Sequence, residues 1–165
     1  MTTALVSALV ERAHYQPLSA ASIGGFSNAR SITDDLVTDT DLYQYQPGTL
    51  IVSTIVLHNT GWTAVAVDGA TVGGPPEGPL VFRELRATAD EYLTGQWSRA
   101  PKVTRFEVQP GKTVYLFVVM RTVAFPLGGP GGGETLNPPT LHVRVLGVHH
   151  ALAVYGANKI GLLVR

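Results

Sequence analysis

Cysteine is absent from the 165 residues of the chain. Its absence excludes disulfide bonds, thiolate metal sites and a cysteine nucleophile. Charged residues make up only 15% of the sequence, below the share in an average soluble protein. The 12 basic and 12 acidic residues cancel. This balance argues against binding through phosphate neutralisation and against a polybasic membrane anchor, so we expect neither nucleic acid nor a membrane among the partners.

Long hydrophobic runs are also missing, since no apolar stretch approaches the roughly 18 residues that a membrane span needs. The first residues do not resemble a signal peptide, because they lack a basic start and because Glu11 and Arg12 interrupt the apolar part. We expect a short amphipathic helix here instead, with Leu5, Leu9 and Val10 on its apolar stripe.

Glycine and proline are abundant, at 18 and 11 residues, which favours strands and tight turns over long helices. Residues 49–58 are almost wholly apolar and residues 112–125 are the most hydrophobic stretch, so both are predicted to be buried strands. Leu141, Val143 and Val145 alternate with polar residues, as in a half-buried strand. Further strands are predicted at residues 62–67, 80–86, 102–108, 151–155 and 160–164, and a helical turn within residues 87–100.

About seven to nine short strands without alternating helices predict an all-β fold, namely an antiparallel immunoglobulin-like or jelly-roll-like β-sandwich. An irregular arm over residues 1–40 is expected to precede the sandwich domain at residues 41–165.

Up to Asp41 the chain has five acidic and two basic residues, whereas from Pro101 onward it has seven basic and two acidic residues. The simpler interpretation is that these charged residues lie on the surface and have no binding role. The alternative is that the acidic arm docks on a basic face of its own or an adjacent subunit.

The central strand should bury one face in the core. We expect Leu116, Val118 and Met120 on that face, opposite inward residues such as Val52 and Val56.

Two segments carry a family pattern: residues 51–67, with a strand, Asn59-Thr60-Gly61 and a second strand, and residues 106–120, with Pro110-Gly111 before an apolar strand. Between residues 49 and 155 the chain resembles the immunoglobulin-like accessory domains of bacterial surface proteins and tailed-bacteriophage virions. The resemblance implies a sandwich without catalytic residues. The chain departs from antibody-type domains because it lacks their cysteine pair.

Three patterns invite a ligand-binding interpretation, and each has a simpler one. Glycine-rich residues 128–133 lack the Lys-Ser or Lys-Thr of a phosphate loop, and a strand follows them, so we expect a contact or mobile loop over residues 126–139. The histidines could ligate a metal, but isolated surface histidines are the more common case. The aspartates lack the spacing of a calcium loop. The residues concerned are His58, His142, His149 and His150, and Asp34, Asp35, Asp39 and Asp41.

No nucleophile-elbow or zinc-protease motif occurs in the sequence. Aromatic residues could form a sugar-stacking platform, although aromatics on strands more often belong to a core. The candidates are Tyr43, Tyr45, Trp62, Tyr92 and Trp97.

These observations favour a non-enzymatic structural or interaction protein without a cofactor. We expect a homo-oligomer built into an assembly such as a bacteriophage virion, as a capsid decoration or a head or tail accessory protein. The alternative is a carbohydrate- or ligand-binding module of a bacterial surface protein, with the cell surface or the cytoplasm as its location. The interaction residues expected are Leu5, Leu9 and Val10 in the arm and Gly129, Gly131, Gly132 and Gly133 in the glycine-rich loop.

Overall fold

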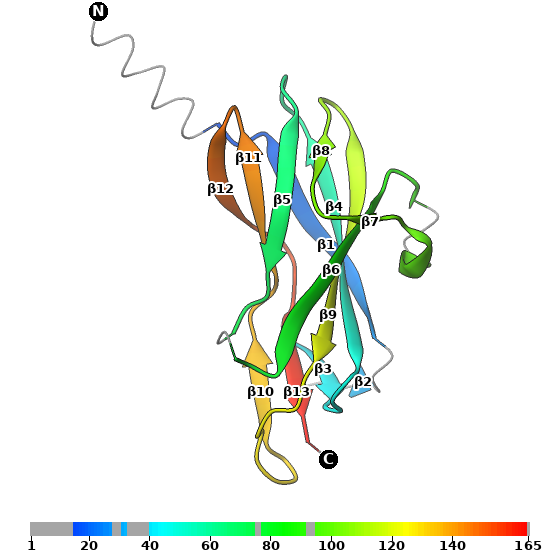
Figure 1. Cartoon of the computed structure of the whole chain (residues 1–165), viewed down its shortest axis with the longest axis vertical. Coiled ribbons are helices and arrows are strands. Elements are labelled where there is room, and N and C mark those ends of the chain that lie inside the picture. The colour runs from blue at the N-terminus through cyan, green and yellow to red at the C-terminus, as the bar shows by residue number, and fades with distance from the viewer. Residues whose placement is uncertain (1–14, 28–30, 33–39, 75–76, 92–94, 165) are drawn as a thin grey trace, which may run out of the picture.

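The structure is a computed structural model, and it describes residues 15–27, 31–32, 40–74, 77–91 and 95–164. Nearly all of the regular structure in these residues is strand (Figure 1). The elements are β1 (Leu18–Ser27), β2 (Ser31–Ile32), β3 (Thr40–Gln44), β4 (Leu50–Asn59), β5 (Val65–Thr71), β6 (Leu80–Thr88), the 3-10 turn η2 (Trp97–Arg99), β7 (Lys102–Val103), β8 (Phe106–Val108), β9 (Thr113–Thr122), β10 (Gly133–Leu136), β11 (Thr140–Val145), β12 (Val148–Ala153) and β13 (Lys159–Leu163).

The strands form one five-stranded and two four-stranded sheets. The five-stranded sheet has the order β1-β4-β9-β6-β7, and all its pairs are antiparallel. β9 lies at its centre, as the hydrophobicity of this stretch predicted. Of the four-stranded sheets, the second sheet has the order β12-β11-β5-β8, and the third sheet has the order β10-β13-β3-β2. Their one departure from the expected antiparallel pattern is the parallel pair β13–β3.

The two smaller sheets follow one another along the long axis of the molecule, with β5, β11 and β12 in one half and β10, β13 and β3 in the other (Figure 1). Residues from all three sheets pack into one core: Leu116 comes from the five-stranded sheet, Val143 from the second sheet and Leu162 from the third. The predicted all-β sandwich is therefore confirmed.

β4 and β9 bury both of their faces, and the two faces differ in what covers them. Leu116, Val118 and Met120 are fully buried in the main core, as predicted. The partners expected for them were wrong, because the register pairs Ile51 with Met120 and Ile55 with Leu116, whereas Val52 pairs with Val119 and Val56 with Tyr115 on the other face. Directly paired residues share a face of the sheet, so Val52 and Val56 point away from the main core.

Asn59 explains how the end of β4 is fastened. Its side-chain amide donates to the main-chain oxygens of Thr63 and Val108, both at 2.8 Å, while its oxygen accepts from the N–H of Gly61 at 2.9 Å. The Asn59-Thr60-Gly61 turn expected from the sequence thus also ties β4 to β8 in the second sheet.

The region before residue 41 differs from the irregular arm that the sequence predicted. β1 forms an edge of the five-stranded sheet, where it pairs with β4 along its length, so residues 18–27 belong to the sandwich. The predicted helix, with Leu5, Leu9 and Val10, lies outside the described residues.

Two further expectations are corrected. Residues 102–108 were predicted as one strand, but they form β7 in the five-stranded sheet and β8 in the second sheet. Residues 126–139 were predicted as a loop, but they contain β10, which pairs with β13. Residues 102–108 do not form one strand because the chain crosses from the five-stranded sheet to the second sheet between β7 and β8. β10 can begin at a glycine because main-chain pairing needs no large side chains.

Candidate functional site

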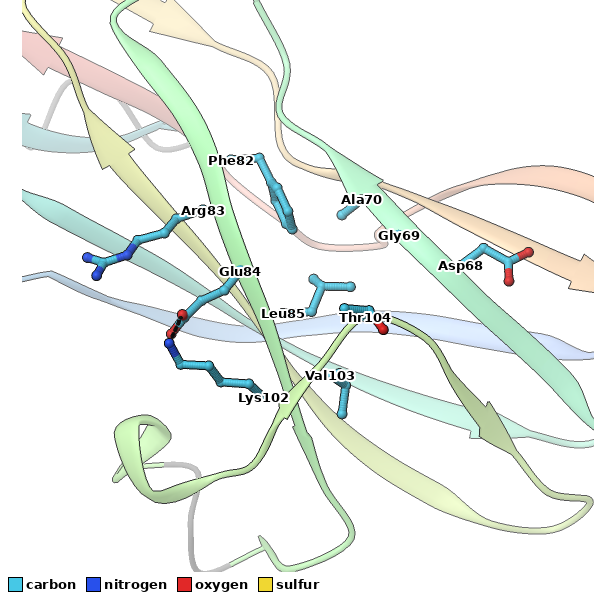
Figure 2. Close-up of a pocket in the computed structure, with 10 residues that line it drawn as sticks. All are labelled: Asp68, Gly69, Ala70, Phe82, Arg83, Glu84, Leu85, Lys102, Val103 and Thr104. Carbon is cyan, nitrogen blue, oxygen red and sulfur yellow. Dashed lines mark ion pairs between the residues drawn. The ribbon is translucent and has the colours of Figure 1, made fainter.

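A cavity of about 500 Å³ opens between β5 and β6, on one side of the sandwich. We call it the side cavity. Its apolar lining comes from both layers, and charged residues surround the lining (Figure 2). The ten lining residues are Asp68, Gly69, Ala70, Phe82, Arg83, Glu84, Leu85, Lys102, Val103 and Thr104.

The cavity exists because two strands are paired only in part. β8 pairs with β5 along Val65, Ala66 and Val67. β7 pairs with β6 only at Leu85 and Arg86. Residues 68–71 of β5 and residues 80–84 of β6 therefore each keep one edge that pairs with no described strand. Such an edge presents main-chain N–H and C=O groups that another strand can bind.

A bulge in β6 directs apolar side chains into this opening. The register with β9 shifts between Phe82 and Glu84, so Arg83 is an extra residue in the strand. In a regular strand, residues three apart face opposite sides. Because of the extra residue, Phe82 and Leu85 both point toward β5, whereas Arg83 and Glu84 point to the other side of β6 (Figure 2). Leu85 is buried, but 42% of the Phe82 surface remains exposed.

Ion pairs fix the charged groups beside the cavity. Glu84 lies 2.6 Å from Lys102 and 2.7 Å from Arg86. Partial burial acts to raise the pKa of Glu84, but hydrogen bonds and charge from Lys102 and Arg86 outweigh it, so this pKa lies below its ordinary value. Glu84 is therefore ionised at neutral pH, and it holds β7 against β6.

A second charged group centres on Asp68, on the outer surface of the second sheet. Its carboxylate lies 3.0 Å from Arg105, 3.3 Å from Arg144 and 3.9 Å from His149. The register shift between His142 and Val143 makes Asp68 the extra residue of β5. The bulge places this acidic residue among basic residues of three different strands or loops.

An exposed aromatic pair lies elsewhere on the surface. The rings of Tyr15 and Trp62 stack with their centres 5.7 Å apart, and Trp62 is 72% exposed. Gly61 permits the arrangement, since a side chain there would collide with Tyr15 and Pro17. A hollow of about 520 Å³ adjoins the pair. Sequence reasoning singled out Trp62 but missed Tyr15, because no pattern connects residues that far apart.

The other candidate aromatics do not join this pair. Tyr43 is buried in the core, and the Tyr45 hydroxyl bonds to the main chain of Val123 and Phe125. Trp97 packs on the outer face of the five-stranded sheet. Tyr92 lies outside the described residues. The four of these aromatics that the structure describes therefore do not gather into one platform, and the simpler interpretation, a place in the core, holds for Tyr43.

The predicted glycine-rich contact loop lies at the end of the molecule where β10 and β13 meet (Figure 1). Gly131 donates to Val164 at 2.9 Å, and Val164 donates to Gly132 at 2.8 Å. A side chain on Gly129 would meet no atom within 4 Å, whereas one on Gly132 or Gly133 would collide with main-chain oxygens. These glycines form a tight turn attached to β13, and their role as a contact stays a prediction.

The four candidate histidines have different surroundings. His58 bonds to Thr113 at 3.0 Å and His142 to Thr71 at 3.2 Å. His149 faces Asp68, while the buried Nε2 atom of His150 has no hydrogen-bond partner among the described residues. Across the described ranges, no group of three or more histidine and acidic side chains is arranged to hold a metal ion.

Of the four candidate aspartates, Asp41 is the one within the described residues. Asp41 accepts a hydrogen bond of 3.0 Å from Asn158. Asp34, Asp35 and Asp39 fall outside the described residues.

In the part of the chain that the structure covers, no helix has the length and apolar character to cross a membrane.

The side cavity thus combines an apolar floor, two strand edges that pair with no described strand, and charged residues of which Asp68, Glu84 and Lys102 are held in ion pairs. This combination suits the binding of an extended apolar segment. Comparison of the chain with protein-family models finds no match, and a search of curated proteins finds no similar sequence.

Proposed function

We propose that the chain is a non-enzymatic interaction protein that forms one subunit of a larger assembly, such as a bacteriophage virion. The observation that carries this proposal is the side cavity, where Phe82 stays 42% exposed between two strand edges that pair with no strand of the described residues. Proteins normally cover or charge a free strand edge, because such an edge pairs readily with another chain. An edge beside an exposed aromatic ring fits a surface that a partner covers.

The resemblance to immunoglobulin-like accessory domains supports the same proposal. It gives the virion as the proposed location and a capsid decoration, head or tail accessory protein as the proposed role. In this proposal, the protein acts through its surface and needs no cofactor.

Sedimentation velocity over a wide range of concentrations tests the proposal. We expect the chain to self-associate, and we expect Phe82→Asp to weaken the association at least tenfold without changing the circular dichroism spectrum. Ile23→Asp is the matched control, because Ile23 is 52% exposed on β1, at the far edge of the same sheet. A chain that stays monomeric at every concentration would contradict the proposal.

A second function, carbohydrate binding, is favoured by the stacked Tyr15–Trp62 pair. An exposed aromatic face can stack on a sugar ring, and the hollow beside it also exposes Gln16. Titration with neutral oligosaccharides, followed by tryptophan fluorescence, tests this function. The signal should be lost in Trp62→Ala and kept in Trp97→Phe, and the absence of any response in the unchanged chain would rule the function out.

A further inference from the structure

We propose that the side cavity binds residues 3–10 of a second copy of this chain, which add as a strand along residues 80–84 of β6. This inference rests on the proposed function, since it names the partner of the side cavity within the assembly. It assigns a donor segment and an acceptor edge that together would connect neighbouring copies.

The acceptor is defined by geometry. Residues 80–84 of β6 offer main-chain groups along an edge without a described partner strand, and residues 68–71 of β5 offer them along the facing edge. Between the edges lie Phe82, Leu85 and Ala70. Recognition by strand addition uses such an edge for affinity and apolar pockets for alternate side chains.

The donor is defined by composition. Residues 3–10 read Thr-Ala-Leu-Val-Ser-Ala-Leu-Val and carry no charge. In an extended conformation, Ala4, Val6, Ala8 and Val10 share one face, and this face is wholly apolar. Although the pattern also predicts a helix, an isolated helix of this length is marginal in water, so helix formation would oppose strand addition only weakly.

Charge at the end of the donor segment agrees with this pairing. Glu11 follows the apolar run. Arg83 is exposed on the side of β6 opposite Phe82, and it makes no ion pair within the described part of the chain. A neighbouring copy would bring these opposite charges to the same edge.

The position of Tyr15 favours a second copy over the same copy. Stacking on Trp62 fixes Tyr15, and the described chain starts in the half of the molecule that holds β5, β11 and β12, opposite the half where β6 begins (Figure 1). The 14 preceding residues can span up to about 50 Å. Within one molecule they would have to turn back along the sandwich to reach the side cavity, whereas in the proposed assembly they would enter the cavity of a neighbouring copy.

The lack of cysteine allows a direct test by disulfide cross-linking in the full chain. One variant carries Ala8→Cys in the donor segment, and a second, of different tagged mass, carries Ala70→Cys in the cavity wall. The control acceptor is Ala153→Cys, which is exposed on β12 of the same sheet as β5. Mixing separate single-cysteine variants ensures that any mixed product joins two copies.

We expect the mixed dimer to form at least fivefold faster with Ala70→Cys than with Ala153→Cys, and Phe82→Asp in the acceptor to abolish this preference. Equal rates would overturn the inference, as would a double variant, Ala8→Cys with Ala70→Cys, that closes a disulfide only within its own chain. If the chain self-associates in sedimentation but shows no preference in cross-linking, the proposed function stands and only this inference fails. A monomer at every concentration removes both.

Discussion

The guanidinium carbon of Arg86 lies 5.6 Å from the centre of the Trp97 ring, and the same group donates to the main-chain oxygens of Ser98 and Ala100 at 2.7 Å. These contacts hold the segment around η2 on the outer face of the five-stranded sheet. There, Trp97 and Ala100 cover Phe117 and Val52. Arg86 therefore fastens the segment that covers the second buried face of the sheet.

Replacing Arg86 by lysine should loosen this cover. A single ammonium group cannot reproduce the planar set of donors that reaches Glu84, Ser98 and Ala100 together. We expect the free energy of unfolding to fall by about 1–3 kcal/mol, measured by urea denaturation. Arg99→Lys is the control. The exposed guanidinium of Arg99 bonds to the Gln96 side chain and to no other described side chain, so this variant should change stability by less than about 0.5 kcal/mol. Equal effects of the two variants would contradict the role given to Arg86.

Acid should weaken the attachment of β7 to β6 through Glu84. Burial raises the pKa of Glu84, but Lys102 and Arg86 together lower it below its ordinary value of 4.5. A carboxyl whose pKa is lower in the folded state contributes stability above its unfolded pKa and loses that contribution as the pH falls through the folded pKa. The stability difference between the unchanged chain and Glu84→Gln should therefore shrink as the pH falls below 4.5. Urea denaturation at neutral and acidic pH measures this difference, and a constant value would refute the assignment.

Much of the strand pattern could be predicted from the sequence, because runs such as residues 49–58 combine β-branched side chains with turn residues at their ends. The inward face of these strands could not be predicted. β4 is apolar on both faces, so alternation gives no information about whether Val52 or Ile51 meets the main core. The η2 segment decides this by covering Val52, which is a tertiary contact.

The candidate site was missed for a similar reason. A bulge at Arg83 aligns Phe82 with Leu85, and incomplete pairing of two strands leaves the cavity open. Neither feature has a sequence pattern of its own. Tyr15 and Trp62 likewise meet only because β1 and β4 pair along their length and bring together the residues next to each strand.

Leu116→Ala should cost about 2–5 kcal/mol, because Leu116 is fully buried between Ile55 and Ala87 on neighbouring strands and its loss leaves a cavity. Ile23→Ala is the comparison at an exposed position and should be almost neutral. Denaturant unfolding gives both values. A loss of only a few tenths of a kcal/mol at Leu116 would be incompatible with its place in the core.

The glycine-rich turn should respond very differently at two neighbouring positions. Gly132→Ala should destabilise the chain by about 1–3 kcal/mol, because the new methyl group would collide with the main-chain oxygen of Leu127. Gly129→Ala should be neutral or slightly stabilising, since no atom lies within 4 Å and alanine restricts the unfolded chain. Thermal unfolding of the two variants checks the contrast. Similar melting temperatures would mean that the turn is not held as described.

Alkaline pH should destabilise the third sheet through Tyr43. Burial, and secondly the charge of Asp41, raises the pKa of Tyr43 to about 12. A group whose pKa is raised in the folded state contributes stability that is fully present below its unfolded pKa and is lost as the pH rises through the folded pKa. Between the ordinary value of 10.0 and about 12, the unfolded chain therefore ionises Tyr43 before the folded chain does.

Tyr43→Phe keeps the buried ring but cannot ionise, so its stability relative to the unchanged chain should rise by up to about 2 kcal/mol across this interval. Tyr155→Phe, at a side chain that is 84% exposed, is the matched control and should lose stability with pH as the unchanged chain does. Urea denaturation in steps from neutral to alkaline pH measures all three proteins, and parallel curves for the unchanged chain and Tyr43→Phe would show that the phenol at this position is not held neutral by the core.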